Sequence, residues 1–190
     1  MVDTLGLLVK PSIACHPEFM TQTQTDSRSR AHSWDDPAIA LSSLPTLSGL
    51  EFLQAMVEGR VPSSPISSTL NFAEFTVEPG QVTVELDPAE FHMNPLGSVH
   101  GGVIAALLDT ACGCAVHTTL PAGTGYTSLD LNTRFLRPVR AGGGRVRCVG
   151  TVLTAGSRTA TAEARLLDGR DRLLAHATST CLIFPIAAPA

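Results

Sequence analysis

The sequence has little charge. Charged residues make up only 16% of the 190-residue chain, whereas hydrophobic residues make up 44%. This composition is far from that of polar, highly charged disordered proteins, and the length suits one ordinary domain with its own core. The net charge of -4 gives no general attraction for phosphate backbones, so we expect no nucleic acid partner and predict that any anion site is local.

Long hydrophobic runs and an export signal are also missing. No stretch approaches the ~20 apolar residues of a membrane span, and residues 1–15 lack a basic start followed by a sustained apolar segment. The five cysteines are an odd number, and Cys112 and Cys114 lie in an apolar stretch, which argues against a disulfide scaffold. We therefore predict a soluble, cytoplasmic protein with no membrane partner.

The chain divides by composition into three parts. Residues 1–43 include the polar, aperiodic run Thr21–Ser33 and are expected to form a flexible N-terminal extension. In residues 44–66, the segment Leu44–Arg60 contains a helix candidate, followed by a rigid connector in which two prolines stop the helix. Residues 67–186 are predicted to form the main domain.

The pattern of the main domain predicts strands interrupted by one helix. Gly101–Thr118 is long, continuously apolar and free of proline, which predicts a buried central helix. Alternating apolar residues and turn-forming glycines predict strands around it. The expected strands are residues 72–77, 81–86, 126–136, 144–155, 158–167 and 173–184. A long helix against a curved antiparallel sheet is an α+β arrangement, with an extra N-terminal helix within residues 44–60.

Asp109 is the residue that this arrangement leaves unexplained. Its neighbours on the helix face are nearly all small, including Ala105, Ala106 and Gly113, so the face allows close approach. An ionised carboxylate there is costly unless it is paired or reaches water, and the helix contains no Lys or Arg. Asp109 is therefore either bonded to a neighbouring strand as a structural residue or part of a functional site.

His100-Gly101-Gly102 stands directly at the start of this helix. Glycines at a helix start expose the first amides, which carry the positive end of the helix dipole and can bind a carbonyl oxygen that develops negative charge. The alternative is that these glycines only allow tight packing between loop and helix. Gly101 and Asp109 are two turns apart, at roughly 5.4 Å per turn, which suggests that the two groups meet across a subunit interface.

Three segments together resemble the PaaI-like branch of the hotdog thioesterases. They are Asn94–Asp109 (NPLGSVHGGVIAALLD), Tyr126–Asn132 (YTSLDLN) and Arg134–Pro138 (RFLRP). The Asn, the HGG, the helix Asp and the strand Ser follow in the family's order, and the resemblance covers roughly Asn71–Phe184. It implies a hotdog fold, in which a curved antiparallel sheet wraps a long central helix. It also implies a homodimer with its active sites at the interface, often paired again into a homotetramer.

The activity that this resemblance implies is hydrolysis of acyl-CoA thioesters to a free acid and CoA. Asp109 would act as general base or nucleophile, the Gly101 amide would polarise the thioester carbonyl, and Ser128 would orient the attacking water. Asn94 and His100 would help to position substrate or water. No metal is expected, and no cofactor beyond the CoA of the substrate. The candidates for contact with CoA are Arg158, Arg134, Arg137 and Gly102.

Two other functions remain open. A hotdog enoyl-CoA hydratase would carry an Asp-x-Asn-Pro-x-His signature, but here His92 stands in place of the Asp, and His100 lies too far from Asn94. A non-catalytic acyl-CoA-binding hotdog sensor would be expected to lose its helix carboxylate. The acyl group, whether aryl or short or medium aliphatic, and the choice between base and nucleophile for Asp109 also stay open.

Overall fold

The computed structural model describes residues 27–186 of the chain. The chain divides into two units between residues 31 and 32, and the fold below is that of the unit that begins at His32. Residues 1–26, most of the predicted N-terminal extension, lie outside the described residues. Within the described part of that extension, Pro37–Leu41 forms a short helix, α1, which the sequence pattern did not predict.

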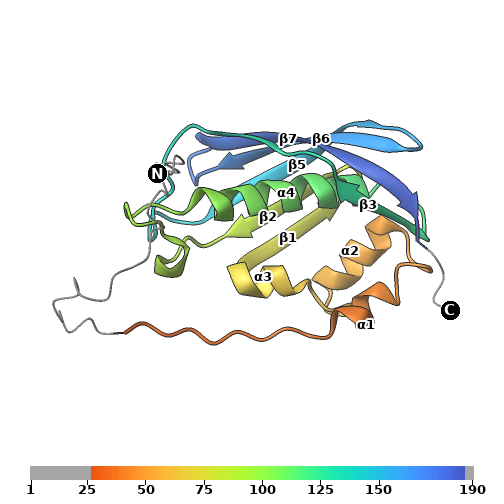
Figure 1. Ribbon diagram of the computed structural model, residues 1–190, viewed down its shortest axis with the longest axis horizontal. Coiled ribbons are helices and arrows are strands. Elements are labelled where there is room, and N and C mark those ends of the chain that lie inside the picture. Colours follow the sequence, from red (N-terminus) through yellow and green to blue (C-terminus); the bar gives the residue numbers. More distant parts are fainter. Residues whose placement is uncertain (1–26, 187–190) are drawn as a thin grey trace, which may run out of the picture. The chain divides into compact units, whose positions relative to one another are not determined.

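Four helices and seven strands make up the described part of this unit (Figure 1). The helices are α1, α2 (Gly49–Val57), α3 (Pro65–Leu70) and α4 (Gly101–His117), with a 3-10 turn at Glu90–His92. The strands are β1 (Phe72–Glu78), β2 (Gln81–Leu86), β3 (Thr124–Ser128), β4 (Asn132–Phe135), β5 (Val146–Ala155), β6 (Thr159–Leu167) and β7 (Leu173–Pro185). Among the described residues, no helix has the length and apolar character needed to span a membrane.

The strands form one antiparallel sheet in the order β1-β2-β5-β6-β7-β3, and β4 also pairs with β7. Helix α4 lies along one face of this sheet (Figure 1) and contacts β2, β3, β5, β6 and β7. The predicted α+β arrangement of a long central helix against an antiparallel sheet is confirmed. We call the face that carries α4 the inner face and the opposite face the outer face.

Small residues let α4 approach the inner face closely. In β6, Ala162 and Ala164 are fully buried, whereas Glu163 between them belongs to the outer face. In β5, a Cβ added at Gly150 would lie 2.1 Å from the carbonyl oxygen of Ala111 in α4. The helix backbone therefore rests directly on β5, and this contact fixes the height of α4 above the sheet.

The strand predicted at residues 126–136 is wrong as a single element, because the segment forms two strands, β3 and β4. Asp130 lies at the break. Its side chain accepts a 3.1 Å hydrogen bond from the Thr180 amide, and its carbonyl accepts a 2.8 Å bond from the Ser179 hydroxyl. Side-chain bonds of this kind compete with the backbone ladder. The other predicted strands agree with β1, β2, β5, β6 and β7 to within two residues at each end.

The helix predicted within Leu44–Arg60 is α2. It begins at Gly49 because Ser48 and Glu51 form a capping box, in which the Ser48 amide donates a 2.9 Å bond to the Glu51 carboxylate. Gly49 packs against the end of α4, where an added Cβ would lie 1.8 Å from the carbonyl oxygen of His117. The predicted connector differs, because Pro65 starts α3, and proline suits the first turn of a helix.

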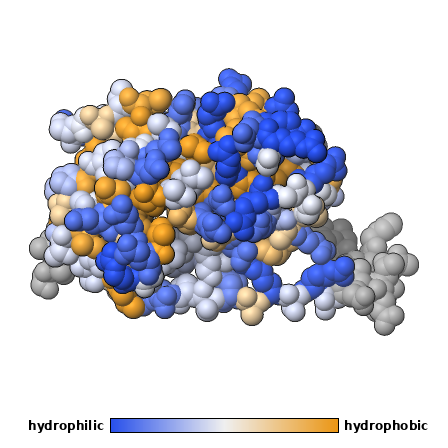
Figure 2. Space-filling model, turned by 180° about the vertical axis from the view of Figure 1, so that it is seen from behind, coloured by the Kyte–Doolittle hydropathy of each residue, from blue (hydrophilic) through white to orange (hydrophobic). Residues whose placement is uncertain are grey.

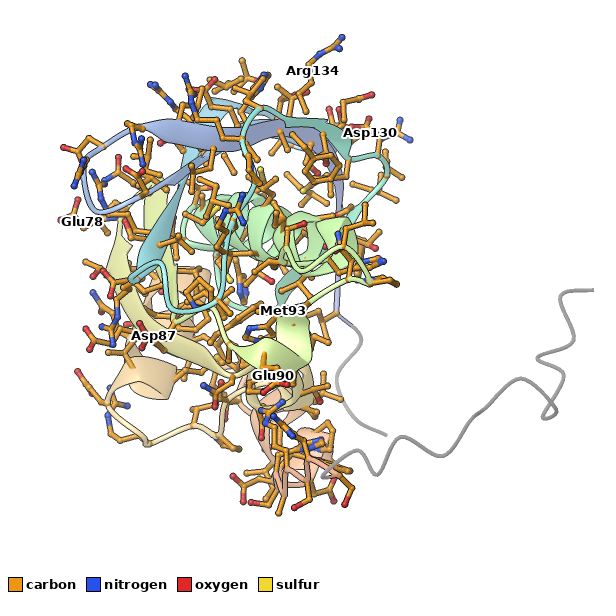
Figure 3. The ribbon with its side chains drawn as sticks, turned by 90° about the vertical axis from the view of Figure 1, so that its left-hand side faces the viewer. Glu78, Asp87, Glu90, Met93, Asp130 and Arg134 are labelled. Atoms are coloured by element: carbon orange, nitrogen blue, oxygen red, sulfur yellow. The ribbon has the colours of Figure 1, made fainter. Side chains whose placement is uncertain are left out.

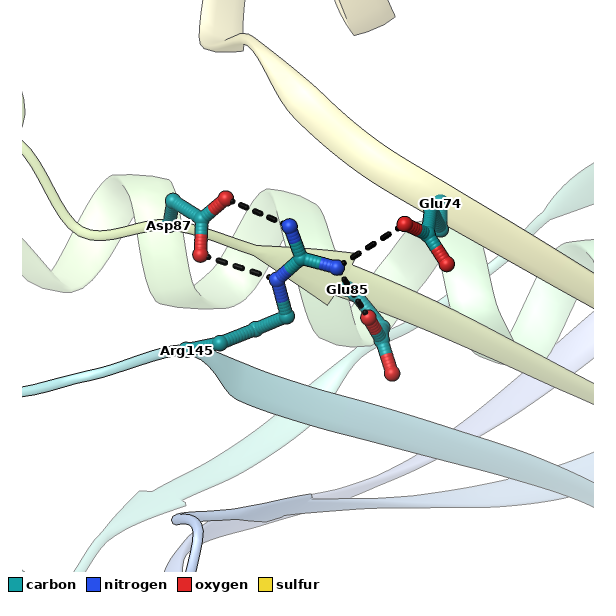
Figure 4. Close-up of polar contacts among 4 residues, drawn as sticks. All are labelled: Glu74, Glu85, Asp87 and Arg145. Atoms are coloured by element: carbon teal, nitrogen blue, oxygen red, sulfur yellow. Dashed lines mark hydrogen bonds and ion pairs between the residues drawn. The ribbon is translucent and has the colours of Figure 1, made fainter.

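An ion-pair network joins three strands near the start of β5 (Figure 4). Arg145 donates to both carboxylate oxygens of Asp87 at 2.9 and 2.8 Å, to Glu85 at 2.9 Å and to Glu74 at 3.0 Å. These hydrogen bonds from Arg145 lower the pKa of Asp87. Solvent and salt screen these surface charges, so the network orients side chains more than it stabilises the fold.

Candidate active site

Helix α4 and strand β3 bring Asp109 and Ser128 together. Ser128 Oγ donates a 2.8 Å hydrogen bond to Asp109 Oδ1. Asp109 is half-buried and Ser128, the last residue of β3, is exposed, so the pair lies where the core meets solvent. We call these two residues the carboxylate pair. A bond from Asp109 to a neighbouring strand is also what a structural role for Asp109 would give, and the catalytic roles of both residues stay predictions.

Uncharged side chains surround Asp109 on the side of the core. Burial and the charge of Asp109 raise the pKa of Cys114 to about 12, and burial raises the pKa of Tyr126 well above its usual value. Cys181, which is fully buried, stands directly opposite Ser128 in the pairing of β3 with β7, and burial raises its pKa as well. These thiol and phenol groups are protonated at neutral pH, so none of the three adds a second negative charge beside Asp109.

His100 caps the start of α4 and determines which helix amides stay available. Its Nδ1 accepts a 2.9 Å hydrogen bond from the Gly102 amide, and its carbonyl accepts bonds from the amides of Val103 and Ile104. Of the first four helix amides, only that of Gly101 has no acceptor within residues 27–186. Gly101 therefore keeps its predicted potential as an oxyanion donor, whereas the amide of Gly102, a predicted CoA contact, is engaged inside the protein.

Asn94 holds the loop before α4. Its Oδ1 accepts hydrogen bonds from the amides of Leu96 at 2.9 Å and Ser98 at 3.3 Å, and its Nδ2 donates to Ser98 Oγ at 3.0 Å. A pocket of about 350 Å³ lies beside this loop, and we call it the amide pocket. The amide pocket is lined by Asn94, Ser98, Val99, Gly101, Ile104, Phe135, Leu136, Arg137, Pro138 and Val139.

The carboxylate pair and the amide pocket are separate places in one chain. Gly101 and Asp109 stand about 12 Å apart along the helix axis, because eight residues rise by roughly 1.5 Å each. Neither Asp109 nor Ser128 lines the amide pocket. The predicted site residues thus fall into two groups, with Asn94, His100 and Gly101 at the start of α4 and Asp109 and Ser128 at its middle.

The three arginines predicted to contact CoA are likewise not gathered at one place. Arg137 lines the amide pocket and donates a hydrogen bond to the Leu173 carbonyl. Arg158 is exposed in the turn between β5 and β6, at the end of the sheet where β3 pairs with β7. Arg134 is exposed in β4. Arg137 thus lies with the group at the start of α4, and Arg158 lies at the end of the sheet that holds β3.

A known protein family matches the region of the chain that holds these residues. The model of the Thioesterase superfamily matches residues 96–175, from the loop before α4 into β7. The chain has the hotdog fold of this superfamily.

Two bacterial hotdog structures illustrate the likeness. PaaI of Escherichia coli, from the phenylacetic acid degradation operon, has a TM-score of 0.63 at 20% identity, covering 76% of this chain and all 100% of that one. A phenylacetic acid degradation-related protein of Ralstonia eutropha has a TM-score of 0.62 at 28% identity, covering 68% of this chain and 97% of that one. At 20% identity the likeness to PaaI shows a shared fold, and the Ralstonia protein shares the same fold at higher identity.

A human relative carries a thioesterase name. Acyl-coenzyme A thioesterase 13 is 34% identical over 64 residues, which are 34% of this chain and 45% of the relative. The chain spans about half the length of the first curated relatives that it matches, 56% and 45%. The names of these relatives are those of an esterase and of acyl-CoA thioesterases.

Two residues near Asp109 in this hotdog core were missed by the sequence analysis. Tyr126 fits against α4 because Gly113 has no side chain, since an added Cβ there would lie 2.7 Å from the Tyr126 ring. Cys181 backs Ser128 from β7. A glycine in the middle of an apolar helix was the one signal that a large side chain approaches there. In the part of the chain that the structure describes, no three His, Cys, Asp or Glu side chains are grouped to hold a metal.

Proposed function

We propose that this hotdog protein hydrolyses acyl-CoA thioesters. The observation that carries the proposal is the 2.8 Å hydrogen bond from Ser128 to Asp109 Oδ1. Within residues 27–186, the other carboxylate oxygen of Asp109 receives no hydrogen bond. A carboxylate with one oxygen oriented and the other open is suited to take a proton from water.

In the proposed reaction, a water molecule beside Asp109 and Ser128 attacks the carbonyl carbon of the thioester while Asp109 takes its proton. The carbonyl oxygen becomes an oxyanion, which the Gly101 amide and the positive end of the α4 dipole stabilise. When the intermediate collapses, the carbon–sulfur bond breaks and the CoA thiolate takes the proton from Asp109. Direct attack by Asp109, followed by hydrolysis of the acyl anhydride, is the alternative route through the same carboxylate.

The proposed active site combines two copies of the chain. Because about 12 Å separates Gly101 from Asp109 along α4, one copy would supply Asp109 and Ser128 and a second copy the Gly101 amide. Exposed apolar side chains near the amide pocket support self-association. They are Met93 (38% exposed), Leu96 (92%), Phe135 (54%) and Leu136 (48%). Figure 2 shows that hydrophobic side chains also reach the surface in several patches on one face. A homodimer, or two such dimers paired as a homotetramer, is the proposed assembly.

His100 and Asn94 have supporting roles in this proposal. Because His100 Nδ1 accepts the Gly102 N–H, a neutral His100 ring carries its proton on Nε2, which can donate to substrate. Asn94 holds the loop that borders the amide pocket. Arg137 in that pocket and Arg158 near the carboxylate pair are candidates for the CoA phosphates.

Release of CoA thiol from a panel of acyl-CoAs tests the proposal. The wild type is expected to cleave at least one substrate, and Asp109→Asn is expected to lower kcat by on the order of 10² or more with little change in melting temperature. Ser128→Ala is expected to lose less, about tenfold, because orienting water is a smaller task than activating it. Asp35→Asn, which removes an exposed carboxylate, is the matched control.

Two outcomes would contradict the proposal. Binding of acyl-CoA without any cleavage by the wild type would instead support an acyl-CoA sensor. Unchanged activity per folded molecule in Asp109→Asn, together with a lower melting temperature, would make Asp109 a structural residue.

A further inference from the structure

Three basic side chains form one row across the outer face of the sheet. Arg134 of β4 is directly opposite His176 of β7, and His176 is directly opposite Arg165 of β6. Ala175 and Ala177, on either side of His176, are buried in the core, so His176 and its two partners belong to the outer face. Figure 3 shows Arg134 pointing away from α4.

The two arginines of this row carry charges of the same sign. Arg134 and Arg165 are separated by one strand, at roughly 10 Å, so their positive charges repel each other across His176. Arg134 and Arg165 are exposed and His176 is half-buried, and none of the three forms an ion pair with any residue of the described part, 27–186. By contrast, Arg147, on the neighbouring strand β5, pairs with Asp171.

The row suits a phosphate group. Adjacent strands lie about 4.8 Å apart, so the Cα atoms of Arg134 and Arg165 are roughly 10 Å apart with the shorter His176 between them. Long arginine side chains can converge from both sides on one anion, and their planar N–H forks match phosphate oxygens. We propose that Arg134, His176 and Arg165 form a phosphate-binding site on the outer face of the sheet.

Glu163 borders the proposed site on one side. It lies two residues before Arg165 on β6 and is therefore on the same face, directly opposite Thr178 of β7. Its carboxylate forms no ion pair with Arg165, and its negative charge would repel an anion bound at the row. Removing the charge of Glu163 should thus strengthen phosphate binding, which gives a variant with the opposite expected sign.

The phosphate has two possible sources, the nucleotide end of CoA or a separate phosphorylated ligand. Phe135, the residue after Arg134, lies against Gly101, since a Cβ added there would be 3.4 Å from its ring. The row and the amide pocket therefore lie on opposite sides of the same strand, β4. The site is inferred from the sheet alone and does not depend on thioester hydrolysis.

Calorimetric titration of the full chain with 3′,5′-ADP and with inorganic pyrophosphate tests the site. Arg134→Gln and Arg165→Gln are each expected to weaken binding about tenfold or more, because each removes charge-assisted hydrogen bonds. Glu163→Gln is expected to tighten binding. Arg170→Gln, in the turn between β6 and β7, removes the same charge from an exposed arginine outside the row and should leave binding unchanged.

The kinetic arm separates the two sources. A raised KM for acyl-CoA with unchanged kcat in Arg134→Gln and Arg165→Gln would assign the phosphate to the substrate, whereas unchanged kinetics with weakened titration would assign it to a separate ligand. No binding of either probe by the wild type, or an equal loss in Arg170→Gln, would overturn the site and leave the proposed hydrolysis standing. Absence of hydrolysis with normal titration would overturn the proposed function and leave the site standing.

Discussion

His117 shows how burial sets the charge of a single side chain. Its ring stands between those of Phe52 and Tyr126, with centroid distances of 5.4 Å to each, and the residue is only 7% exposed. Burial lowers its pKa to about 4, so the ring is neutral in the folded protein at neutral pH. The end of α4 is therefore packed against α2 and β3 by an uncharged histidine.

This neutral histidine makes stability depend on pH. The unfolded chain, with a histidine pKa near 6.5, binds a proton that the folded chain excludes until pH falls to about 4. The free energy of unfolding should therefore be highest above about pH 6.5 and lower by about 2 kcal/mol at pH 5. Urea unfolding at neutral pH and at pH 5 measures this difference. In His117→Gln most of this pH-dependent difference should disappear, whereas the exposed His32→Gln should keep it. An equal difference in both variants would show that His117 is not its source.

Single residues of the site differ in how far the sequence alone identifies them. Asp109 stands out because an ionisable side chain in a small, apolar helix face has no local partner. Ser128 comes only from the family resemblance, because its contact with Asp109 depends on how β3 packs against α4. The capping of Gly102 by His100 was not foreseen, because it depends on the conformation of the loop before the helix.

At the scale of elements, the contact between α4 and β5 is the most constrained. A methyl group at Gly150 would lie 2.1 Å from the Ala111 carbonyl oxygen, so Gly150→Ala must push helix and strand apart. We expect the free energy of unfolding to fall by about 2 kcal/mol or more, as for other overpacked cores. Gly169→Ala is the matched control, because nothing lies within 4 Å of its added Cβ. Equal urea midpoints for the two variants would show that α4 can move away from β5 without lowering the free energy of unfolding.

The sequence predicts helices and strands well where hydrophobic periodicity determines them. It does not predict them where hydrogen bonds between side chains and the backbone determine where an element begins or ends. Helix α4 and most strands follow apolar patterns that are visible in the sequence. The break between β3 and β4 depends on Asp130, whose bonds reach residues about fifty positions later in β7. Likewise, Pro65 predicts a helix end from the sequence alone, although proline also suits the first turn of α3.

At the scale of the whole molecule, complementation tests whether the active site is shared between copies. Gly101→Pro removes the proposed oxyanion donor while keeping a residue that suits the first helical position, and Asp109→Asn removes the carboxylate. Each variant alone should be nearly inactive. In mixed dimers from co-expression, one of the two shared sites keeps both groups, so about one quarter of wild-type activity should return with random pairing.

The same co-expression of the two variants also tests the alternative, an active site formed within one chain. If Gly101 and Asp109 of one chain served the same substrate, no mixed dimer would contain an intact site, and thiol release would stay near the level of the single variants. The sequence could only suggest this arrangement from the spacing along one helix, because pairing between copies depends on surfaces assembled from distant segments.

The break at Asp130 also determines which side chains of β4 face inward and which face outward. From Ser128 to Asn132 the chain advances four residues, while its partner β7 advances three, from Cys181 to Thr178. This one-residue surplus inverts the alternation, so Ser128 and Phe135 share the inner face and Arg134 faces outward. Deleting one residue between β3 and β4 would shift β4 by one position against β7, so Phe135 would turn outward beside His176 and Arg134 would turn inward, with Leu136 in the position over Gly101. A change in the length of this connection would thus invert the orientation of the β4 side chains and alter both faces of the sheet, although no other residue is substituted.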